Sequence, residues 1–371
     1  MQEIDLTPTV DEILSGSVVG GHRRHLPSTS EPPAQALERV VLDAVAEFDQ
    51  AYVSFSGGID STLVLSVAVA VARRAGLPEP IPVTLCFPSV NTAQEGEWQQ
   101  RVVEALALRE WERIVVDDQL DFVGPYAERH LTAHGVLFPP NVHFHAPMLD
   151  FARGGVLLTG LDGDGVLGSW KYGHLWTRRL NTYKGVVAAE ALATTFARPL
   201  LRRKPRHDGY EWLVPEVRSR MLLRDAEERW DEPIVWRARE EWVAGRRYLN
   251  MAEHSLGLVA AASGAAVHHP LLDPRFIGAL ASLRPIRGWP NRATLVRDLF
   301  ADHLPVPVFQ RRTKATFDDA VYCDASKAVM ARAGTDKLPP EVDGPRLVHV
   351  LRSGDAGPLG MLIQHLWLAE R

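Results

Sequence analysis

The stretch that decides the fold reads Tyr52-Val53-Ser54-Phe55-Ser56-Gly57-Gly58-Ile59-Asp60-Ser61-Thr62. Its first residues alternate in the manner of a short buried strand, and the apolar run after Asp60 continues to Gly76, a typical helix stop. The pattern therefore predicts a strand, a tight glycine loop and a helix. Glycines let the backbone come close to a ligand, and the helix N-terminus offers unpaired N–H groups and a positive dipole end. We expect a phosphate-binding site here.

The polar side chains of this loop indicate which phosphate it binds. Ser56 and Ser61 are hydroxyl donors, and Asp60 suits a ligand of the Mg²⁺ that accompanies a nucleotide. The loop has no Gly-Lys-Ser/Thr, so it is not of the Walker type. The pattern Ser-Gly-Gly-x-Asp-Ser resembles the pyrophosphate-binding loop of the ATP pyrophosphatase (PP-loop) enzymes, which cleave ATP to AMP and pyrophosphate. This resemblance assigns nucleotide contacts to Ser56, Gly57, Gly58, Asp60 and Ser61; an ordinary glycine turn is the alternative.

Composition bounds the class of protein and its partners. The 371 residues are 46% hydrophobic and 23% charged, which is typical of a globular protein. The net charge of -5 does not favour a polyanionic partner, so we expect no nucleic acid partner. The two cysteines, Cys86 and Cys323, lack metal-ligand spacing and fit a reduced, cytoplasmic protein. Since the apolar runs are too short to span a bilayer, we expect no membrane association.

Alternating strand and helix patterns predict the architecture. After the first strand, further strands are expected over 81–87, 113–116 and 156–159, with helices over 34–48, 91–108 and 143–153. This alternation predicts an α/β fold with a doubly wound, mainly parallel sheet. Beyond residue 171 the patterns are mostly helical. Ligands of such sheets bind beyond the carboxyl ends of the strands, where the glycine loop falls.

A second glycine-rich loop follows the expected fourth strand. It reads Thr159-Gly160-Leu161-Asp162-Gly163-Asp164-Gly165-Val166-Leu167-Gly168-Ser169. Asp-Gly pairs are common in turns, so this loop alone is ambiguous. Together with the first loop it predicts a metal site, because a second carboxylate facing Asp60 would complete the ligands of Mg²⁺.

Two later stretches carry further candidates. His268-His269-Pro270-Leu271-Leu272-Asp273 predicts a compact buried turn, since no third metal ligand is near the histidine pair. Arg311, Arg312 and Lys314 follow a proline-restrained loop and precede Phe317. Such loops are often merely solvated, but preorganised cations are what a reaction building charge on phosphate and carbonyl oxygens requires.

Four motifs in this order resemble one family. They are similar to those of the synthetase domain of the asparagine synthetase group, which includes β-lactam synthetases, carbapenam synthetases and the macrolactam-forming cyclases of lasso peptides. The family's patterns are Ser-Gly-Gly-x-Asp-Ser, Ser/Thr-Gly-x-Gly-x-Asp-Glu, Pro-Phe-Leu-Asp and Arg-x-Lys-x-x-Phe. The resemblance covers 33–371, with a nucleotide-binding core over 33–170 and a mainly helical substrate-binding part over 171–371. Residues 1–32 are expected to be a lead-in segment and linker.

The resemblance also implies a mechanism. ATP would bind at the strand ends, with Mg²⁺ between Asp60 and Asp164. A substrate carboxylate would attack the α-phosphate to give an acyl-adenylate, and an amine would displace AMP to form an amide. Further nucleotide contacts would be Leu85 and Phe87 at adenine, with Gly160 and, at the pyrophosphate, Arg292. Lys314, with Arg312 beside it, matches the lysine that stabilises charge on the intermediate and the pyrophosphate.

Three departures from the family pattern argue against ordinary asparagine synthesis. The segment before residue 33 is too short for a glutaminase domain, so the amine is expected from free ammonia, an amine substrate or a partner protein. Leu161 stands where relatives have a glutamate or tyrosine, so either Asp162 serves as the base or the amine arrives deprotonated. Gly165 and Ala266 replace two glutamates.

These observations favour an AMP-forming amide ligase of natural-product or peptide biosynthesis. Its substrates would be a small-molecule or peptide carboxylate and an amine, and lactam or macrolactam closure is one version. A tRNA-modifying PP-loop enzyme is an alternative, although the cysteines fit it poorly and the Lys314 motif has no place in it. A noncatalytic ATP-binding partner of a larger complex is another.

Overall fold

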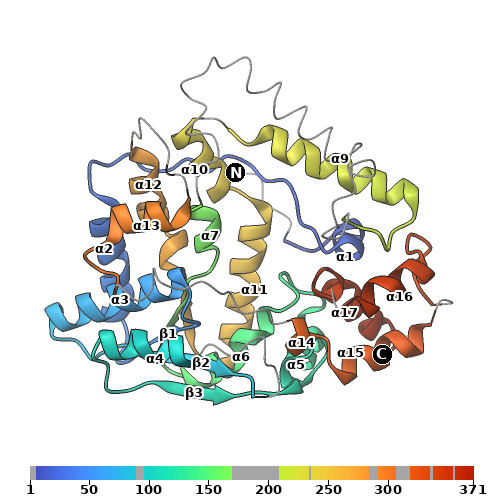
Figure 1. Cartoon of the computed structure of the whole chain (residues 1–371), viewed down its shortest axis with the longest axis horizontal. Coiled ribbons are helices and arrows are strands. Elements are labelled where there is room, and N and C mark those ends of the chain that lie inside the picture. Colours follow the sequence, from blue (N-terminus) through green and yellow to red (C-terminus); the bar gives the residue numbers. More distant parts are fainter. Residues whose placement is uncertain are drawn as a thin grey trace.

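A parallel five-stranded sheet lies at the centre of the computed structural model of this protein (Figure 1). The structure describes residues 6–88, 96–168, 209–233, 235–283, 289, 291–305, 318–334, 337–353 and 356–371. The strands are β1 (Ala51–Ser54), β2 (Ile81–Cys86), β3 (Glu112–Val115), β4 (Val156–Leu158) and β5 (Ala266–His268). Their order in the sheet is β3-β2-β1-β4-β5. The predicted doubly wound α/β fold is confirmed.

The strand order creates a switch point beside β1. The chain adds β2 and β3 on one side of β1 and then returns to add β4 and β5 on the other. Parallel sheets of this kind bind ligands where the winding reverses, at the carboxyl ends of the strands. The loops that leave β1 and β4 are the two glycine-rich loops, so the topology brings them together.

Layers of helices cover both faces of the sheet. Successive side chains of β4 belong to different cores, one on each face. Val156 and Leu158 belong to the core formed with α2 (Pro33–Ala46), α3 (Ile59–Ala75), α10 (Trp236–Ala244) and α12 (Pro274–Ser282). Leu157 belongs instead to the core formed with α6 (Ala146–Phe151) and α11 (Arg247–Ser263). Successive side chains of a strand point to opposite faces, so a continuous apolar run is what a strand buried on both faces requires.

The fifth strand is the main difference from the predicted elements. A strand before the first loop was predicted and is β1, and the strands predicted over 81–87, 113–116 and 156–159 agree with β2, β3 and β4 to within one residue at each boundary. The sequence predicts no strand before the turn at 268–273, yet Ala266–His268 pair in parallel register with Val156–Leu158. Three residues carry no periodicity of their own. β5 is a strand through its backbone pairing with the edge of β4 that does not face β1.

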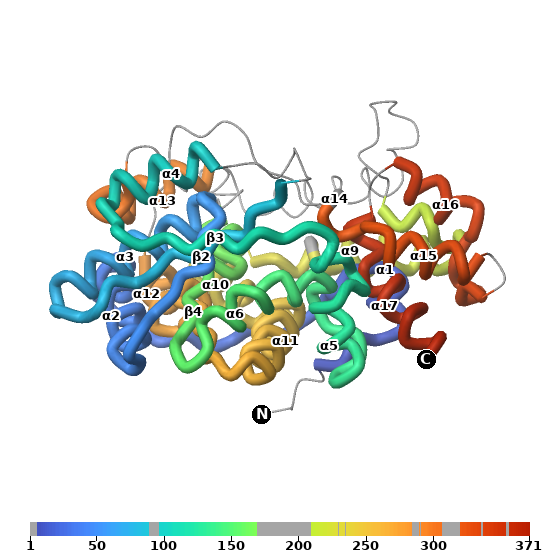
Figure 2. The backbone as a smooth tube through the Cα atoms, turned by 90° about the horizontal axis from the view of Figure 1, so that it is seen from below, coloured from blue at the N-terminus to red at the C-terminus, as the bar shows by residue number. Residues whose placement is uncertain are grey.

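A second core lies among the C-terminal helices. It joins α5 (Pro125–His134), α9 (Pro215–Asp231), α15 (Asp324–Ala333), α16 (Gly344–Arg352) and α17 (Gly360–Ala369). Helices α15 to α17 lie at the opposite end of the molecule from α2 and α3, as Figure 2 also shows. Asp121 joins two of its segments, because its buried carboxylate accepts hydrogen bonds from Cys323 N at 2.7 Å and Ser326 Oγ at 2.5 Å. Over the described ranges, no helix combines the length and apolar character needed to cross a membrane.

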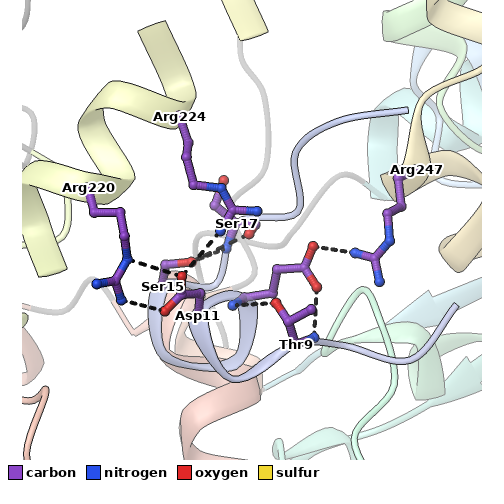
Figure 3. A network of polar contacts seen from close by, with 8 residues as sticks. Thr9, Asp11, Ser15, Ser17, Arg220, Arg224 and Arg247 are labelled. Carbon is purple, nitrogen blue, oxygen red and sulfur yellow. Dashed lines mark hydrogen bonds and ion pairs between the residues drawn. The ribbon is translucent and has the colours of Figure 1, made fainter. Parts of the chain in front are cut away.

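The described part of the N-terminal segment, residues 6–32, packs against the rest of the protein: Leu14 belongs to this second core and Leu26 to the core around α2 and α3. Helix α1 (Val10–Ser15) begins at a capping box between Thr9 and Glu12 and buries Leu14, whose carbonyl accepts a hydrogen bond from Trp212 Nε1 at 2.7 Å. Asp11 pairs with Arg220 and Arg224, and Glu12 pairs with Arg247 (Figure 3). The partners lie about 200 residues along the chain, as the 209-residue separation of Asp11 and Arg220 shows, so no local pattern reveals them.

Replacing Leu14 tests whether this segment contributes to stability. Leu14→Ala removes a side chain that is 1% exposed, so the free energy of unfolding should fall by about 2–5 kcal/mol. Val10→Ala is the matched control, because Val10 lies on the same helix and is 64% exposed; it should change stability by about 0.5 kcal/mol or less. Urea unfolding of both variants measures the difference. Equal stability of the two variants would contradict the described packing.

Candidate active site

The first glycine loop joins β1 to α3 and has the geometry of an anion site. Gly57 has a φ of +76°, which favours glycine, and a Cβ there would stand 3.0 Å from Gln99 Cγ. Ser61 Oγ accepts a hydrogen bond from Ser56 N at 3.2 Å and lies 3.1 Å from Ser56 Oγ. Gly58 provides no capping side chain at the start of α3. The first N–H groups of a 17-residue helix are therefore available to phosphate oxygens.

The second glycine loop packs directly against the first. A Cβ on Gly163 would stand 2.5 Å from Asp60 Oδ1, and one on Gly160 would stand 2.9 Å from Ser61 N. Both approaches are closer than any side chain allows, so glycine is required at these positions. Asp164, the next residue along the chain, is exposed. The contact at Gly163 thus brings the two glycine loops together, and a shared metal site on Asp60 and Asp164 stays a prediction.

Asp162, also in the second loop, makes a hydrogen bond to helix α11. Its φ of +48° is left-handed, and its Oδ2 accepts a hydrogen bond from Tyr248 of α11 at 3.1 Å. Burial, with the charge of Asp164 nearby, raises the pKa of Asp162 to about 7. A side chain at Gly165 would fall on the Asp162 carboxylate. The missing glutamate at 165 thus has a physical reason, since Asp162 occupies its space.

Side chains from distant elements hold the second loop in place. Thr159 Oγ1 lies 2.7 Å from His269 Nδ1 and accepts a hydrogen bond from Leu161 N at 3.2 Å. Burial lowers the pKa of His269 to about 3, so its imidazole is neutral. Arg239 of α10, which is buried and paired with Glu240, donates to Gly165 O at 2.9 Å.

None of these holding contacts was predicted from the sequence. The buried turn at 268–273 is as predicted, but its hydrogen bond to Thr159 is not. Arg239 and Tyr248 lie on amphipathic helices with no motif around them, so the sequence gives no signal for their roles.

Arg292 contacts Asp60 from helix α13 (Arg292–Phe300). It is the first residue of this helix, which Asn291 caps, and its guanidinium forms an ion pair with Asp60. Burial lowers the pKa of Arg292 to about 10, which still leaves it charged at neutral pH. The residue predicted to bind pyrophosphate and a residue predicted to bind Mg²⁺ are therefore direct neighbours. Phosphate oxygens are favourable partners for the same guanidinium.

A cavity adjoins the first loop at the predicted adenine position. Leu85 and Phe87 line it from the end of β2, and Ser56 lines it from the loop itself. Its remaining apolar lining comes from Phe55, Phe144 and Met148. A mostly apolar slot that opens next to a phosphate site suits a flat base attached to phosphates.

The donor set of the acidic pair fits Mg²⁺. Two carboxylates next to phosphate sites match the usual binding of Mg²⁺ by one or two carboxylates and substrate phosphates. Within the ranges described above, no group of three or more His, Cys, Asp or Glu side chains forms a metal site by itself. Arg312 and Lys314 lie outside the described residues, so their roles stay predictions.

A comparison with protein families decides the relationship. The family model described as asparagine synthase matches residues 34–340. The chain belongs to the asparagine synthase family. This confirms the resemblance drawn from the four motifs, and the match includes both glycine loops, Arg292 and Lys314. No curated protein matches the sequence.

Family membership supports a general activity for the site. The asparagine synthase domain is associated with ATP-dependent ligase-type chemistry. In this family member, the two loops that the sequence predicts to bind nucleotide follow β1 and β4 and meet at the switch point of the sheet.

Gly163→Ala tests the contact between the loops. The added methyl group overlaps the Asp60 carboxyl group, so the loops must separate and ATP affinity should fall by about tenfold or more. Gly257→Ala is the control, because nothing lies within 4 Å of a Cβ at that position of α11. Calorimetric titration of both variants with ATP and Mg²⁺ gives the affinities. Unchanged ATP affinity in Gly163→Ala would argue that the loops do not share the ligand.

Proposed function

We propose that this asparagine synthase family member is an AMP-forming amide ligase that adenylates a carboxylate and transfers the acyl group to an amine. One observation carries the proposal: the Gly163 backbone meets the Asp60 carboxyl group, which joins a phosphate loop to an acidic loop at the sheet's switch point. The adenine base would then fit the cavity lined by Leu85 and Phe87, and the phosphates would fit the N-terminus of α3. A divalent cation would fit the two carboxylates of the loops.

The residues around Asp60 would bind the phosphates of ATP. The N–H groups at the start of α3 and the hydroxyls of Ser56 and Ser61, which lie side by side, would donate hydrogen bonds to phosphate oxygens. Asp60 and Asp164 would hold Mg²⁺, which when bound supplies positive charge to the phosphate oxygens. Arg292 would then exchange its ion pair with Asp60 for one with the pyrophosphate part.

The proposed reaction has two steps. A carboxylate oxygen of the substrate attacks the α-phosphorus, and the bond to the β-phosphate oxygen breaks, so pyrophosphate leaves with the electron pair. The amine nitrogen then attacks the acyl carbon, loses a proton, and AMP leaves. Both steps build negative charge on oxygen, and Lys314 with Arg312 would stabilise it, as the motif match implies.

The proton of the amine needs an acceptor. Leu161 cannot take it, so Asp162 is proposed as the base unless the amine arrives already deprotonated. The structure supports this role in one respect: the hydrogen bond from Tyr248 fixes the Asp162 carboxylate in a single direction.

The substrate class follows from the departures from the family pattern. The substitutions at 161, 165 and 266 favour a product other than asparagine, so we propose a role in natural-product or peptide biosynthesis in the cytoplasm. The substrates would be a small-molecule or peptide carboxylate and an amine, inter- or intramolecular. A partner protein that delivers one of them is compatible with this proposal.

Pyrophosphate release tests the proposal. Purified protein is incubated with ATP, Mg²⁺ and panels of acids and amines, and pyrophosphate and AMP are measured together. Release that requires a particular acid, with AMP in equal amount, is the expected result. Asp60→Asn and Lys314→Ala should each lower the rate by about 100-fold or more, because Asp60 is the proposed ligand of Mg²⁺ and Lys314 the proposed partner of the developing negative charge.

Asp49→Asn is the matched control, because Asp49 is exposed and precedes β1, at the end of the strand opposite to the first loop; it should retain the wild-type rate. Wild-type rates in Asp60→Asn or Lys314→Ala would overturn the assignment of that residue. ATP binding without pyrophosphate release on any panel would favour the noncatalytic alternative.

A further inference from the structure

The cavity beside the first loop is lined by residues from two parts of the chain. The strand side carries Phe55, Leu85 and Phe87. The opposite side comes from the 3-10 turn Val142–His145 and from α6, and it contributes Phe144, His145 and Met148. Apolar side chains on both sides suit the faces of a flat ring. The polar side chains along the lining decide which ring is preferred.

Three of these polar side chains already have protein partners. Thr84 Oγ1 donates to Phe55 O at 2.7 Å and accepts from Trp111 Nε1 at 2.9 Å. Gln99 Nε2 donates to Ser56 O at 3.3 Å, and Ser56 Oγ lies 3.1 Å from Ser61 Oγ. The hydrogen bonds of these groups within the protein maintain the shape of the cavity.

His145 differs from them. Its Nδ1 is buried, and the ring interacts with the Val142 carbonyl of the same turn in a contact that falls short of full hydrogen-bond geometry. Burial lowers the pKa of His145 to about 4, with the carbonyl of Val142 acting in the opposite direction and the neighbouring His143 adding to the decrease. The ring is therefore neutral at physiological pH and presents one N–H donor and one lone pair.

A neutral imidazole matches the edge of adenine. Adenine carries a donor, the 6-amino group, next to an acceptor, N7, whereas guanine presents two acceptors at the same edge. We propose that His145 reads the base of the nucleotide through a hydrogen bond between its imidazole and the edge of adenine that carries the 6-amino group. This inference rests on the proposed function, because it assumes that ATP occupies the cavity, and it adds a specificity-determining residue to that site.

The test compares ATP with purine riboside triphosphate, which lacks the 6-amino group. Affinities of the full-length protein for both nucleotides are measured by calorimetry with Mg²⁺ at neutral pH. The wild type should bind ATP about tenfold more tightly, which is the effect of one buried hydrogen bond. In His145→Phe this ratio should fall to about one, because phenylalanine keeps a ring in the wall but has no polar atom.

His134→Phe is the control, since His134 is an exposed histidine at the end of α5; it should keep the wild-type ratio. A wild-type ratio in His145→Phe overturns the inference, and so does equal binding of both nucleotides by the wild type. Failure of the wild type to bind ATP at all overturns the proposed function instead. The two failures are thus distinguishable.

A measurement on the unaltered protein covers the case in which His145→Phe does not fold. The imidazole nitrogen resonances of His145, assigned by comparison with His145→Gln, should shift when ATP is added and shift much less with purine riboside triphosphate. Equal shifts with the two nucleotides would contradict a hydrogen bond to the 6-amino edge.

Discussion

The site depends on one close contact, between the backbone of Gly163 and the carboxyl group of Asp60. The contact exists because β1 and β4 are neighbours at the point where the sheet reverses its winding, so the loops that leave them share one crevice. It brings the second loop against Asp60, which lies in the first turn of α3. Asp60 also forms an ion pair with Arg292 at the start of α13.

The second loop keeps its shape through residues far away in the sequence. His269 contacts Thr159, Arg239 contacts the carbonyl of Gly165, and Tyr248 contacts Asp162. These three residues belong to β5 and its following turn, α10 and α11, so elements outside the first four strands fix the acidic loop. A change in those helices is therefore transmitted to the nucleotide site by hydrogen bonds that can be tested one at a time.

Local patterns predicted the parts of the site that are local. Sequence patterns predict the strand–glycine–helix stretch at 52–62 and the glycine loop at 160–168. A tight turn that binds phosphate needs those residue types at those spacings. β5 and the packing of Leu14 were not predictable, because each depends on a partner brought near only by the fold. The same holds for Arg239 and Tyr248, whose helices carry no motif, and for the ion pair of Arg292.

The most direct test of this account is a structure of the protein with Mg²⁺ and a non-hydrolysable ATP analogue. The account predicts phosphates at the N-terminus of α3, between Gly57 and Gly163, with the metal ion on Asp60 and the Arg292 guanidinium moved from Asp60 to a phosphate oxygen. Phosphates bound elsewhere, or an unchanged ion pair between Arg292 and Asp60 with the nucleotide in place, would contradict it.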